Sequence, residues 1–325
     1  MKEIKELKAF AISNEEIKDV LEDIGWKRLI SEIKKGFLLG SQGKNIVPPK
    51  VYIHTEVSDM RCMPAYLPGY NKNYCGVKII SAAPENRKIG ISTVLGEYLL
   101  RNAKTQELLA VMQAEELTSY RTGAATGVAT ELLSRKDSKI LGMIGLGKQA
   151  YYQTKAILTV RNDINIIKAH DINNKHAKIF KEKYEREFGR EIKIVSLKES
   201  MKSDIVTTST PAIKHFITTE FVKTGIHLNG VGADSKMKIE FEPEIFKKSK
   251  IFVDDILQCV NSGEIYQGLK KRIIKKEDLI FLGDVQDGKV KGRTHKDDIT
   301  FFKSTGVAFQ DLITAILVFE KLRVK

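Results

Sequence analysis

Asp234 is a polar residue at a place where open α/β sheets hold their ligands. In the stretch HLNGVGADSKMKIE it follows Gly230 and Gly232, directly after a strand of the buried type. The carboxyl ends of such strands form the ligand-binding edge of the sheet. A carboxylate there can give a proton to a bound ligand or take one from it. We therefore predict a proton-transfer role for Asp234, with a loop aspartate that caps the next turn as the alternative.

A second stretch, IGLGKQA, has the glycine spacing of a dinucleotide-binding turn. Gly145, Gly147 and Ala150 follow a strand and open a helix. The first glycine permits a tight turn, the second admits a pyrophosphate close to the backbone, and the helix N-terminus faces the phosphates. The next strand ends in Asp171, 24 residues beyond Gly147, where a carboxylate accepts hydrogen bonds from a ribose 2′-hydroxyl and repels a 2′-phosphate. These residues predict NAD in preference to NADP; the alternative is a plain turn with a surface aspartate.

Two positively charged residues lie in segments where a charged side chain calls for a structural or functional explanation. Lys78 is part of the apolar strand CGVKIIS, and burying an unpaired ammonium group is costly. Alternation along a two-faced strand could instead point Lys78 at water. Arg121, in LTSYRTG, can hold a carboxylate with two parallel hydrogen bonds, and its alternative is an ion pair on a helix surface. Both cations are therefore candidate functional residues.

The elements that position these residues alternate between strand and helix past Lys139, which is the pattern of a doubly wound parallel sheet. The strands are KILGMIGLG, INIIKAHD, SDIVTTST, GIHLNGVG and KIFVDD, and the helices are QAYYQTKAILTV and KHAKIFKEKYEREF. We therefore predict an α/β fold with a Rossmann-type parallel-sheet domain at residues 123–303.

The rest of the chain predicts a second, discontinuous α+β domain, residues 1–122 plus 304–325. Ser13 and Glu16 form a capping box before an amphipathic helix, and a second helix begins near Trp26. Short β-rich runs between residues 49 and 112 indicate an antiparallel sheet or a small barrel. The apolar helix GVAFQDLITAILVFEKL is long enough to return to this domain, so the nucleotide domain is inserted within it.

The composition narrows the class of protein. The chain has 325 residues, 42% of them hydrophobic, and a net charge of +13, but its lysine runs lie beside apolar residues without interleaved aromatic side chains, which disfavours nucleic acid. Its three cysteines form no CxxC pair and no metal spacing with the six histidines, so we expect reduced thiols and no metal. The N-terminus lacks an apolar signal segment and no run is long enough to span a bilayer. We expect a cytoplasmic protein without a membrane partner.

Four further motifs, RCMPAY, GVKIIS, ELTSYRTGAATG and GADSKMKIE, lie in this order around IGLGKQA. Together they resemble the ornithine cyclodeaminase and mu-crystallin family, and most closely its archaeal-type alanine dehydrogenase branch. The resemblance runs from about residue 48 to STGVAFQD near the C-terminus. It implies a two-domain homodimer whose first domain binds substrate and dimerises, and which reduces imines or oxidises amines of α-amino acids with NAD(P).

The resemblance also implies roles for individual residues. Asp234 matches the catalytic aspartate of the family, and Lys78 matches a lysine that contacts the substrate carboxylate or the carbon bearing the nitrogen. Arg121 matches a carboxylate ligand. The expected substrate contacts also include Lys50, Arg61 and Met63, and the expected cofactor contacts are Gly145, Gly147, Lys148, Gln149, Asp171, Thr93, Thr208, Lys238 and Ser304.

Two positions bear on the substrate. Ornithine cyclodeaminases carry an acidic residue two positions before the Met-Pro pair, where this chain has Arg61. A cation there would repel the distal ammonium of ornithine and suit a short or anionic side chain. Lys50, in PPKVY, replaces the carboxylate-binding arginine of many members, as in alanine dehydrogenase-like relatives, and offers a point charge in place of a planar fork. We predict interconversion of alanine with pyruvate and ammonia.

Other functions stay open from the sequence. A cyclic ketimine reductase would use the same residues on a preformed imine, and an ornithine cyclodeaminase would release ammonia without net consumption of NAD. A cofactor-dependent binding protein like mu-crystallin is a third alternative, although an intact set of Lys78, Arg121 and Asp234 disfavours it.

Overall fold

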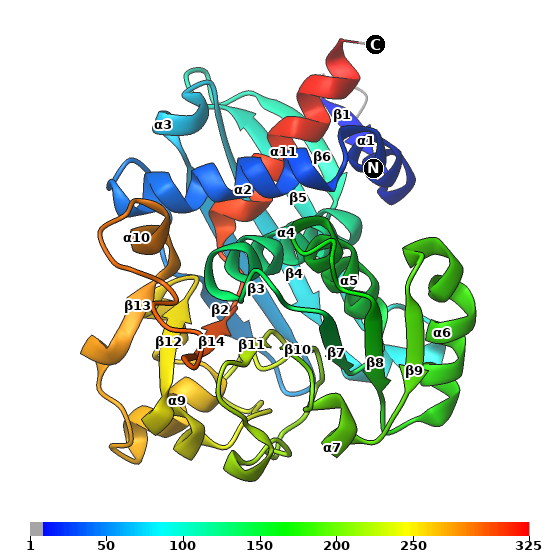
Figure 1. Cartoon of the computed structure of the whole chain (residues 1–325). Helices are drawn as coiled ribbons and strands as arrows, with labels where there is room; N and C mark the ends of the chain where they lie inside the picture. Colours follow the sequence, from blue (N-terminus) through cyan, green and yellow to red (C-terminus); the bar gives the residue numbers. More distant parts are fainter. Residues whose placement is uncertain (1–8, 325) are drawn as a thin grey trace. The chain divides into compact units, whose positions relative to one another are not determined.

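The computed structural model describes residues 9–324 (Figure 1). The chain divides into two compact units, each with its own sheet. Unit 1 comprises Met1–Arg121 together with Val307–Lys325, and unit 2 comprises Thr122–Gly306. Among the described residues, no helix is long and apolar enough to cross a membrane.

Unit 1 contains an open sheet of six strands among the described residues. Its order is β1 (Phe10–Ile12), β6 (Leu108–Gln113), β5 (Val94–Asn102), β4 (Tyr74–Ala82), β3 (Asp59–Tyr66) and β2 (Val51–His54). All neighbours are antiparallel except β1, which pairs with β6 in parallel. The sheet is therefore open, and the alternative prediction of a small barrel is wrong.

The helices of unit 1 cover one face of this sheet. The capping box predicted at Ser13 and Glu16 is confirmed and begins α1 (Asn14–Ile24), which is followed by α2 (Trp26–Ser41). Helix α11 (Ala308–Arg323) packs against β3, β4 and β5 and against both of these helices; Figure 1 shows it in red across the strands. The short segments α3 (Pro68–Asn71) and η1 (Pro84–Ile89) connect strands. The apolar C-terminal helix thus completes the first unit.

Unit 2 is built on a sheet whose eight described strands all run parallel. The order is β13 (Leu279–Phe281), β12 (Ser249–Val253), β14 (Ile299–Lys303), β11 (His227–Gly230), β10 (Ile205–Thr208), β7 (Ile140–Ile144), β8 (Ile166–His170) and β9 (Glu191–Ile194). Strand order reverses between β7 and β10, which is where doubly wound sheets hold their ligands. The predicted α/β fold is confirmed, while β9, β13 and β14 were not predicted.

The connections of unit 2 are helical. Helix α4 (Ala114–Leu133) begins in unit 1 and continues into unit 2, and its residues 121–130 are all buried. The other helices are α5 (Lys148–Val160), α6 (Asn174–Phe188), α7 (Leu197–Ser200), α8 (Ile256–Cys259), α9 (Gly263–Lys270) and α10 (Leu282–Gln286), with 3-10 turns η2 (Thr219–Phe221), η3 (Pro243–Lys248) and η4 (Lys276–Asp278). Small side chains along α4 permit the close packing that this burial requires.

Candidate active site

The glycine turn lies between β7 and α5 in unit 2, next to the point where strand order reverses. Gly145 has a φ of +84°, and a Cβ there would lie 2.6 Å from Thr210 Cγ2. Gly147 is the N-cap of α5, and a Cβ added to it would meet no protein atom within 4 Å. The first position therefore requires glycine for backbone conformation and close packing, and the second leaves open space in front of a helix N-terminus.

Asp171 is attached to this turn through its side chain. Its Oδ2 accepts a hydrogen bond of 2.8 Å from the backbone N–H of Leu146, between the two glycines, and its Oδ1 accepts one of 2.8 Å from Asn173 N–H. Only 10% of the side chain is exposed. The carboxylate is thus held beside the turn at the end of β8, rather than lying free on the surface, and it can present an oxygen to a ribose hydroxyl.

The other predicted cofactor residues lie in different surroundings. Lys148 and Gln149 form the first turn of α5. Thr208, at the end of β10, is fully buried and donates its hydroxyl to Glu240 at 2.8 Å. Ser304 follows β14 and donates to Asp254 at 3.1 Å, and Thr93 lies in unit 1, where its carbonyl accepts from Ala83 N–H at 2.8 Å. The hydroxyls of Thr208 and Ser304 are therefore engaged within the protein.

Asp234 lies on the loop that follows β11. Its Oδ1 pairs with Lys238 Nζ at 2.7 Å, and its side chain is 25% exposed. The loop backbone is held from the segment before α9, because Ser262 Oγ donates to the carbonyl of Asp234 at 3.1 Å and Gly263 N–H donates to that of Ser235 at 2.9 Å. The carboxylate therefore has a cationic neighbour, partial access to solvent and a fixed backbone, which suit proton transfer.

Lys78 and Arg121 meet in unit 1 on a single carboxylate, that of Asp311. Lys78 Nζ lies 2.7 Å from Asp311 Oδ1, and Arg121 Nε lies 3.0 Å from the same oxygen. Arg121 Nη1 also donates to Gln310 at 3.0 Å, and Lys78 to Thr118 at 3.3 Å. All three charged side chains are at least nine-tenths buried. We call Lys78, Arg121 and Asp311 the buried charge cluster.

The buried charge cluster excludes both alternatives for these cations. Lys78 faces α11 rather than water, and Arg121 is buried rather than part of a surface ion pair. Two cations on one carboxylate leave a positive charge uncompensated when both are protonated, and such a charge is costly in a buried place. The cluster can therefore bind one carboxylate of a ligand, which would supply the missing negative charge.

The surroundings of Lys78 change its protonation. Burial, the largest cause, and the charge of Arg121 lower its pKa from 10.5 to about 7, against the attraction of Asp311; the charge of Lys50 lowers it further. Lys50, immediately before β2, thus lies close enough to act on Lys78. A bound carboxylate would favour the charged form and raise the pKa of Lys78 again.

This pKa predicts a pH dependence of folding stability. Between about 7 and 10.5 the unfolded chain binds a proton at Lys78 that the folded chain does not. The free energy of unfolding should therefore rise with pH through this window, by at most about 1.4 kcal/mol per pH unit, and the destabilisation should be fully present below it. Lys78→Met removes this contribution. In urea unfolding from about pH 6 to about pH 9, the free energy of unfolding of the wild type should rise relative to that of the variant. A difference between the two free energies that does not change with pH would contradict the prediction.

Met63 and Arg61 lie on the strand next to Lys78. Met63 is buried and stands directly opposite Lys78 in the pairing of β3 with β4. Arg61, two residues earlier, has its side chain on the same face of β3 because side chains alternate. Its guanidinium binds Asp59 through Nε at 2.8 Å and Nη2 at 3.1 Å and lies 5.6 Å from the ring centre of Tyr52. The structure therefore brings Lys50, Arg61, Met63, Lys78 and Arg121 into one unit.

Three carboxylates with structural roles were missed from the sequence. Asp311 was missed although an acid within the apolar run AFQDLITAIL is itself a signal of a buried partner. Asp254, after β12, accepts from Ser304 Oγ, Thr305 N–H and Gly306 N–H at 2.7–3.1 Å. Glu264, in α9, binds Lys303 at 2.8 Å with both side chains fully buried. Asp254 and Glu264 can be recognised only together with these partners. Among residues 9–324, no group of His, Cys, Asp and Glu is placed to hold a metal ion.

A parallel sheet with a glycine turn beside its point of strand reversal places unit 2 in the Rossmann-like class of α/β proteins. Residues 13–325 match the model of the ornithine cyclodeaminase/mu-crystallin family. The chain belongs to this family, which confirms the resemblance inferred from its motifs.

Individual relatives cover almost the whole chain. Alanine dehydrogenase of Archaeoglobus fulgidus is 38% identical over 315 residues, 97% of this chain and 95% of the relative. The solved structure of an archaeal alanine dehydrogenase dimer with bound NAD has a TM-score of 0.92 at 37% identity, covering 97% of this chain and 96% of that chain. Δ1-pyrroline-2-carboxylate reductase of Thermococcus litoralis, solved with NADH and L-proline, has a TM-score of 0.92 at 36% identity, covering 97% and 98%.

Proposed function

We propose that this protein is an NAD-dependent oxidoreductase that interconverts a small L-amino acid with its 2-oxo acid and ammonia through an imine, and that the pair is alanine and pyruvate. The observation that carries the proposal is the buried charge cluster, in which Lys78 and Arg121 share the one carboxylate of Asp311. Family membership supports it, since relatives of comparable similarity are an alanine dehydrogenase and an imine-reducing enzyme.

The residues of unit 2 fit the cofactor. A Cβ on Gly147 would occupy the open space in front of α5, so glycine leaves room for a pyrophosphate at the helix N-terminus. Asp171, held beside the turn, would accept hydrogen bonds from the ribose. When bound, NADH supplies the hydride for the imine carbon. The solved relatives that contain NAD or NADH support this assignment.

The chain's own residues would perform the remaining steps. Arg121 and Lys78 would bind the carboxylate of the 2-oxo acid, with Lys50 or Arg61 completing its orientation. Once ammonia has added to the carbonyl carbon, Asp234 would donate a proton to the resulting hydroxyl group, which leaves as water, and would take a proton back from the nitrogen, which gives the neutral imine. As the imine carbon is reduced, the nitrogen would gain a proton with the help of Asp234, and oxidation of the amino acid would reverse these steps.

Arg61 supports a short substrate. Its guanidinium is bound to Asp59 and faces the same side of β3 as Met63. Although Asp59 offsets its charge, the guanidinium would present N–H donors to the far end of the substrate, which would disfavour a second ammonium, as in ornithine or lysine, and would suit a methyl group or an anion. We therefore propose that Arg61 selects against diamino acids.

The test is oxidation of NADH by the purified protein, with pyruvate in the presence and absence of ammonium. Oxidation that requires ammonium supports the proposal. Oxidation of NADH with Δ1-pyrroline-2-carboxylate but not with pyruvate and ammonium would overturn the alanine assignment.

The second candidate is therefore a Δ1-pyrroline-2-carboxylate reductase. The Thermococcus litoralis relative favours it, because its TM-score of 0.92 and 36% identity equal or nearly equal those of the archaeal alanine dehydrogenase. A preformed cyclic imine would need the same carboxylate ligands and the same proton donor, but no ammonia. Measuring both substrates on one preparation decides between the candidates.

Asp171 predicts a preference for NADH over NADPH. The variant Asp171→Ser keeps a small polar side chain but removes the negative charge that would repel a 2′-phosphate. We expect the ratio of kcat/KM for NADH to that for NADPH to fall by about tenfold to 100-fold, corresponding to about 1–3 kcal/mol. A ratio that stays the same would contradict the role of Asp171. Asp163→Asn, an exposed aspartate of the same unit, serves as the control.

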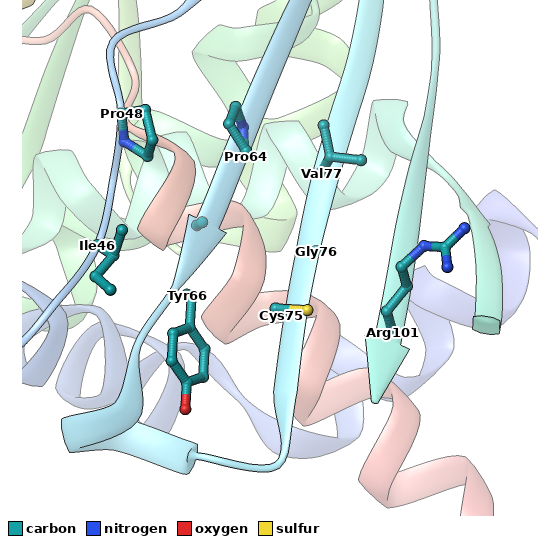
Figure 2. Close-up of a pocket in the computed structure, with 9 residues that line it drawn as sticks. Ile46, Pro48, Pro64, Tyr66, Cys75, Gly76, Val77 and Arg101 are labelled. Atoms are coloured by element: carbon teal, nitrogen blue, oxygen red, sulfur yellow. The ribbon is translucent and has the colours of Figure 1, made fainter. Parts of the chain in front are cut away.

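Unit 1 supports a homodimer. The sheet face opposite α11 carries a pocket of about 290 Å³ lined by Pro64, Tyr66, Cys75, Val77 and neighbours, and Figure 2 shows these side chains in front of the strands with α11 behind. The edge strand β2 exposes Val51 (57%) and Ile53 (49%). Exposed apolar side chains of this kind mark an interaction surface, and an archaeal relative is a dimer. Sedimentation velocity tests the proposal.

A further inference from the structure

Glu240 is a fully buried carboxylate to which no role in the proposed reaction has been assigned. It accepts four hydrogen bonds. Its Oε2 accepts from Thr208 Oγ1 at 2.8 Å and from Gly232 N–H at 2.9 Å, and its Oε1 accepts from Thr210 N–H at 2.7 Å and from Thr210 Oγ1 at 2.8 Å. One side chain thereby joins the segment after β10 to the loop after β11.

Each of these segments leads to a part of the candidate site in unit 2. On the β10 side, Ser209 Oγ donates to the carbonyl of Gly145 at 3.0 Å, and Thr210 Cγ2 lies 2.6 Å from the position of a Cβ on Gly145. On the β11 side, Asp234 N–H donates to the carbonyl of Gly232 at 3.2 Å. Glu240 therefore stands between the glycine turn and the loop that carries Asp234.

The segment after β10 and the loop after β11 are in close contact at Gly232 and Thr210. A Cβ on Gly232 would lie 2.3 Å from the carbonyl oxygen of Thr210, 2.4 Å from its nitrogen and 2.5 Å from Glu240 Oε1. Gly232 is thus needed because the backbone of Thr210 and the carboxylate both approach it. The contact leaves the Glu240 carboxylate as the group that satisfies both backbone N–H donors.

The groups around Glu240 act on its pKa in opposite directions. Burial, the largest cause, and the nearby Glu264 raise its pKa, while Lys303 and the hydrogen bonds from Thr210 and Thr208 lower it. Each oxygen accepts from one backbone N–H group, Oε2 from Gly232 and Oε1 from Thr210, so both oxygens are needed as acceptors. Lys303, which binds Glu264 at 2.8 Å, is a buried positive charge that opposes the rise in the pKa of Glu240.

We propose that Glu240 is a positioning residue, which holds the Asp234 loop at a fixed place relative to the glycine turn. The role of Asp234 in this statement rests on the proposed function; the position of its loop does not. A displacement of about 1 Å in a reacting group can lower a rate by about 100-fold, so a clamp between the cofactor turn and the proton donor acts on turnover rather than on binding.

The test compares Glu240→Gln with Glu242→Gln in the full-length protein. The amide of the first variant keeps the shape of glutamate but presents an NH₂ donor to a backbone N–H donor. Glu242 is a matched control, because its carboxylate accepts from Thr219 N–H at 2.9 Å, nine residues beyond Thr210. In the first variant we expect hydrogen exchange of the Thr210 and Gly232 amides to be about tenfold faster or more, while the control matches the wild type.

Kinetics provide the second readout, with kcat expressed per NADH-binding site. We expect Glu240→Gln to lower kcat by about tenfold to 100-fold, with the affinity for NADH and the KM of the 2-oxo acid or cyclic imine unchanged. Loss of folded protein alone would lower the number of binding sites and leave kcat per site as in the wild type, which would overturn the positioning role.

Unchanged exchange at Thr210 and Gly232 would also overturn the proposal. If the wild type reduces no imine but the Thr210 and Gly232 amides still exchange faster in Glu240→Gln, the structural role of Glu240 is supported and the proposed function is contradicted. The two failures are therefore distinguishable. If Glu240→Gln does not fold, Thr210→Val, which removes one of the four donors and keeps the backbone N–H, should show the same changes at smaller size.

Discussion

Replacing Asp234 by asparagine should lower kcat for imine reduction by about 10² to 10⁴-fold, the usual contribution of a general acid or base. The carboxamide has the shape of the carboxylate but does not transfer its proton. NADH affinity should stay the same, because Asp171 and the glycine turn are unchanged. Steady-state kinetics combined with a fluorescence titration of NADH would measure both quantities.

Two controls define the result for Asp234. Asp163→Asn removes an exposed carboxylate of the same unit, which pairs with Lys139 at 3.3 Å, and should leave kcat as in the wild type. Lys238→Met removes one partner of Asp234, at 2.7 Å, and should lower kcat less than Asp234→Asn, because the carboxylate itself remains. Wild-type turnover in Asp234→Asn would remove this residue from the reaction.

Replacing Arg121 by methionine should lower kcat/KM for the 2-oxo acid or imine by about 10² to 10³-fold, mostly through a higher KM. Removing one partner of a buried, hydrogen-bonded charge pair costs about 3–4 kcal/mol. The fold should survive, because Lys78 and Asp311 remain paired at 2.7 Å. What is lost is the uncompensated positive charge that would bind the substrate carboxylate.

The variant Arg121→Lys separates charge from geometry. Lysine keeps the positive charge but lacks the planar fork of donors, so its loss of kcat/KM should be smaller than that of Arg121→Met. The affinity of either variant for NADH should match the wild type. An unchanged KM in Arg121→Met would show that the buried charge cluster serves folding and not the substrate.

Features that depend on neighbours in the chain were predictable from the sequence. The capping box at Ser13 uses residues three positions apart, and the turn from β7 into α5 needs glycine at position 145 because of its positive φ. Alternating strands and helices predicted the parallel sheet, and the ordered motifs predicted the family. The capping box, the glycine turn and the alternation are local signals, because they reflect backbone conformation or hydrophobic periodicity over a few residues. The family follows instead from motifs spread along most of the chain.

Strands β1, β9, β13 and β14 were the part of the fold that these signals missed, and three of them have only three or four residues. Strands β13 and β9 have three and four residues, too few for a hydrophobic period to develop. Strand β1, also of three residues, pairs with β6 from a distant part of the sequence. Such strands exist because an existing sheet edge satisfies their backbone groups, which is a property of the assembled sheet.

The sequence by itself determined the class of fold, the family and the residue types of the candidate site. Only the tertiary structure decided the direction and partners of the charged side chains. Alternation left either face of β4 possible for Lys78, and the choice depends on α11, which brings Asp311 to it from 233 positions away. The hydrogen-bond partners of Glu240 likewise come from two segments that meet at a sheet edge. Burial makes an uncompensated charge costly, so the packing that buries these groups also determines which partners they must have.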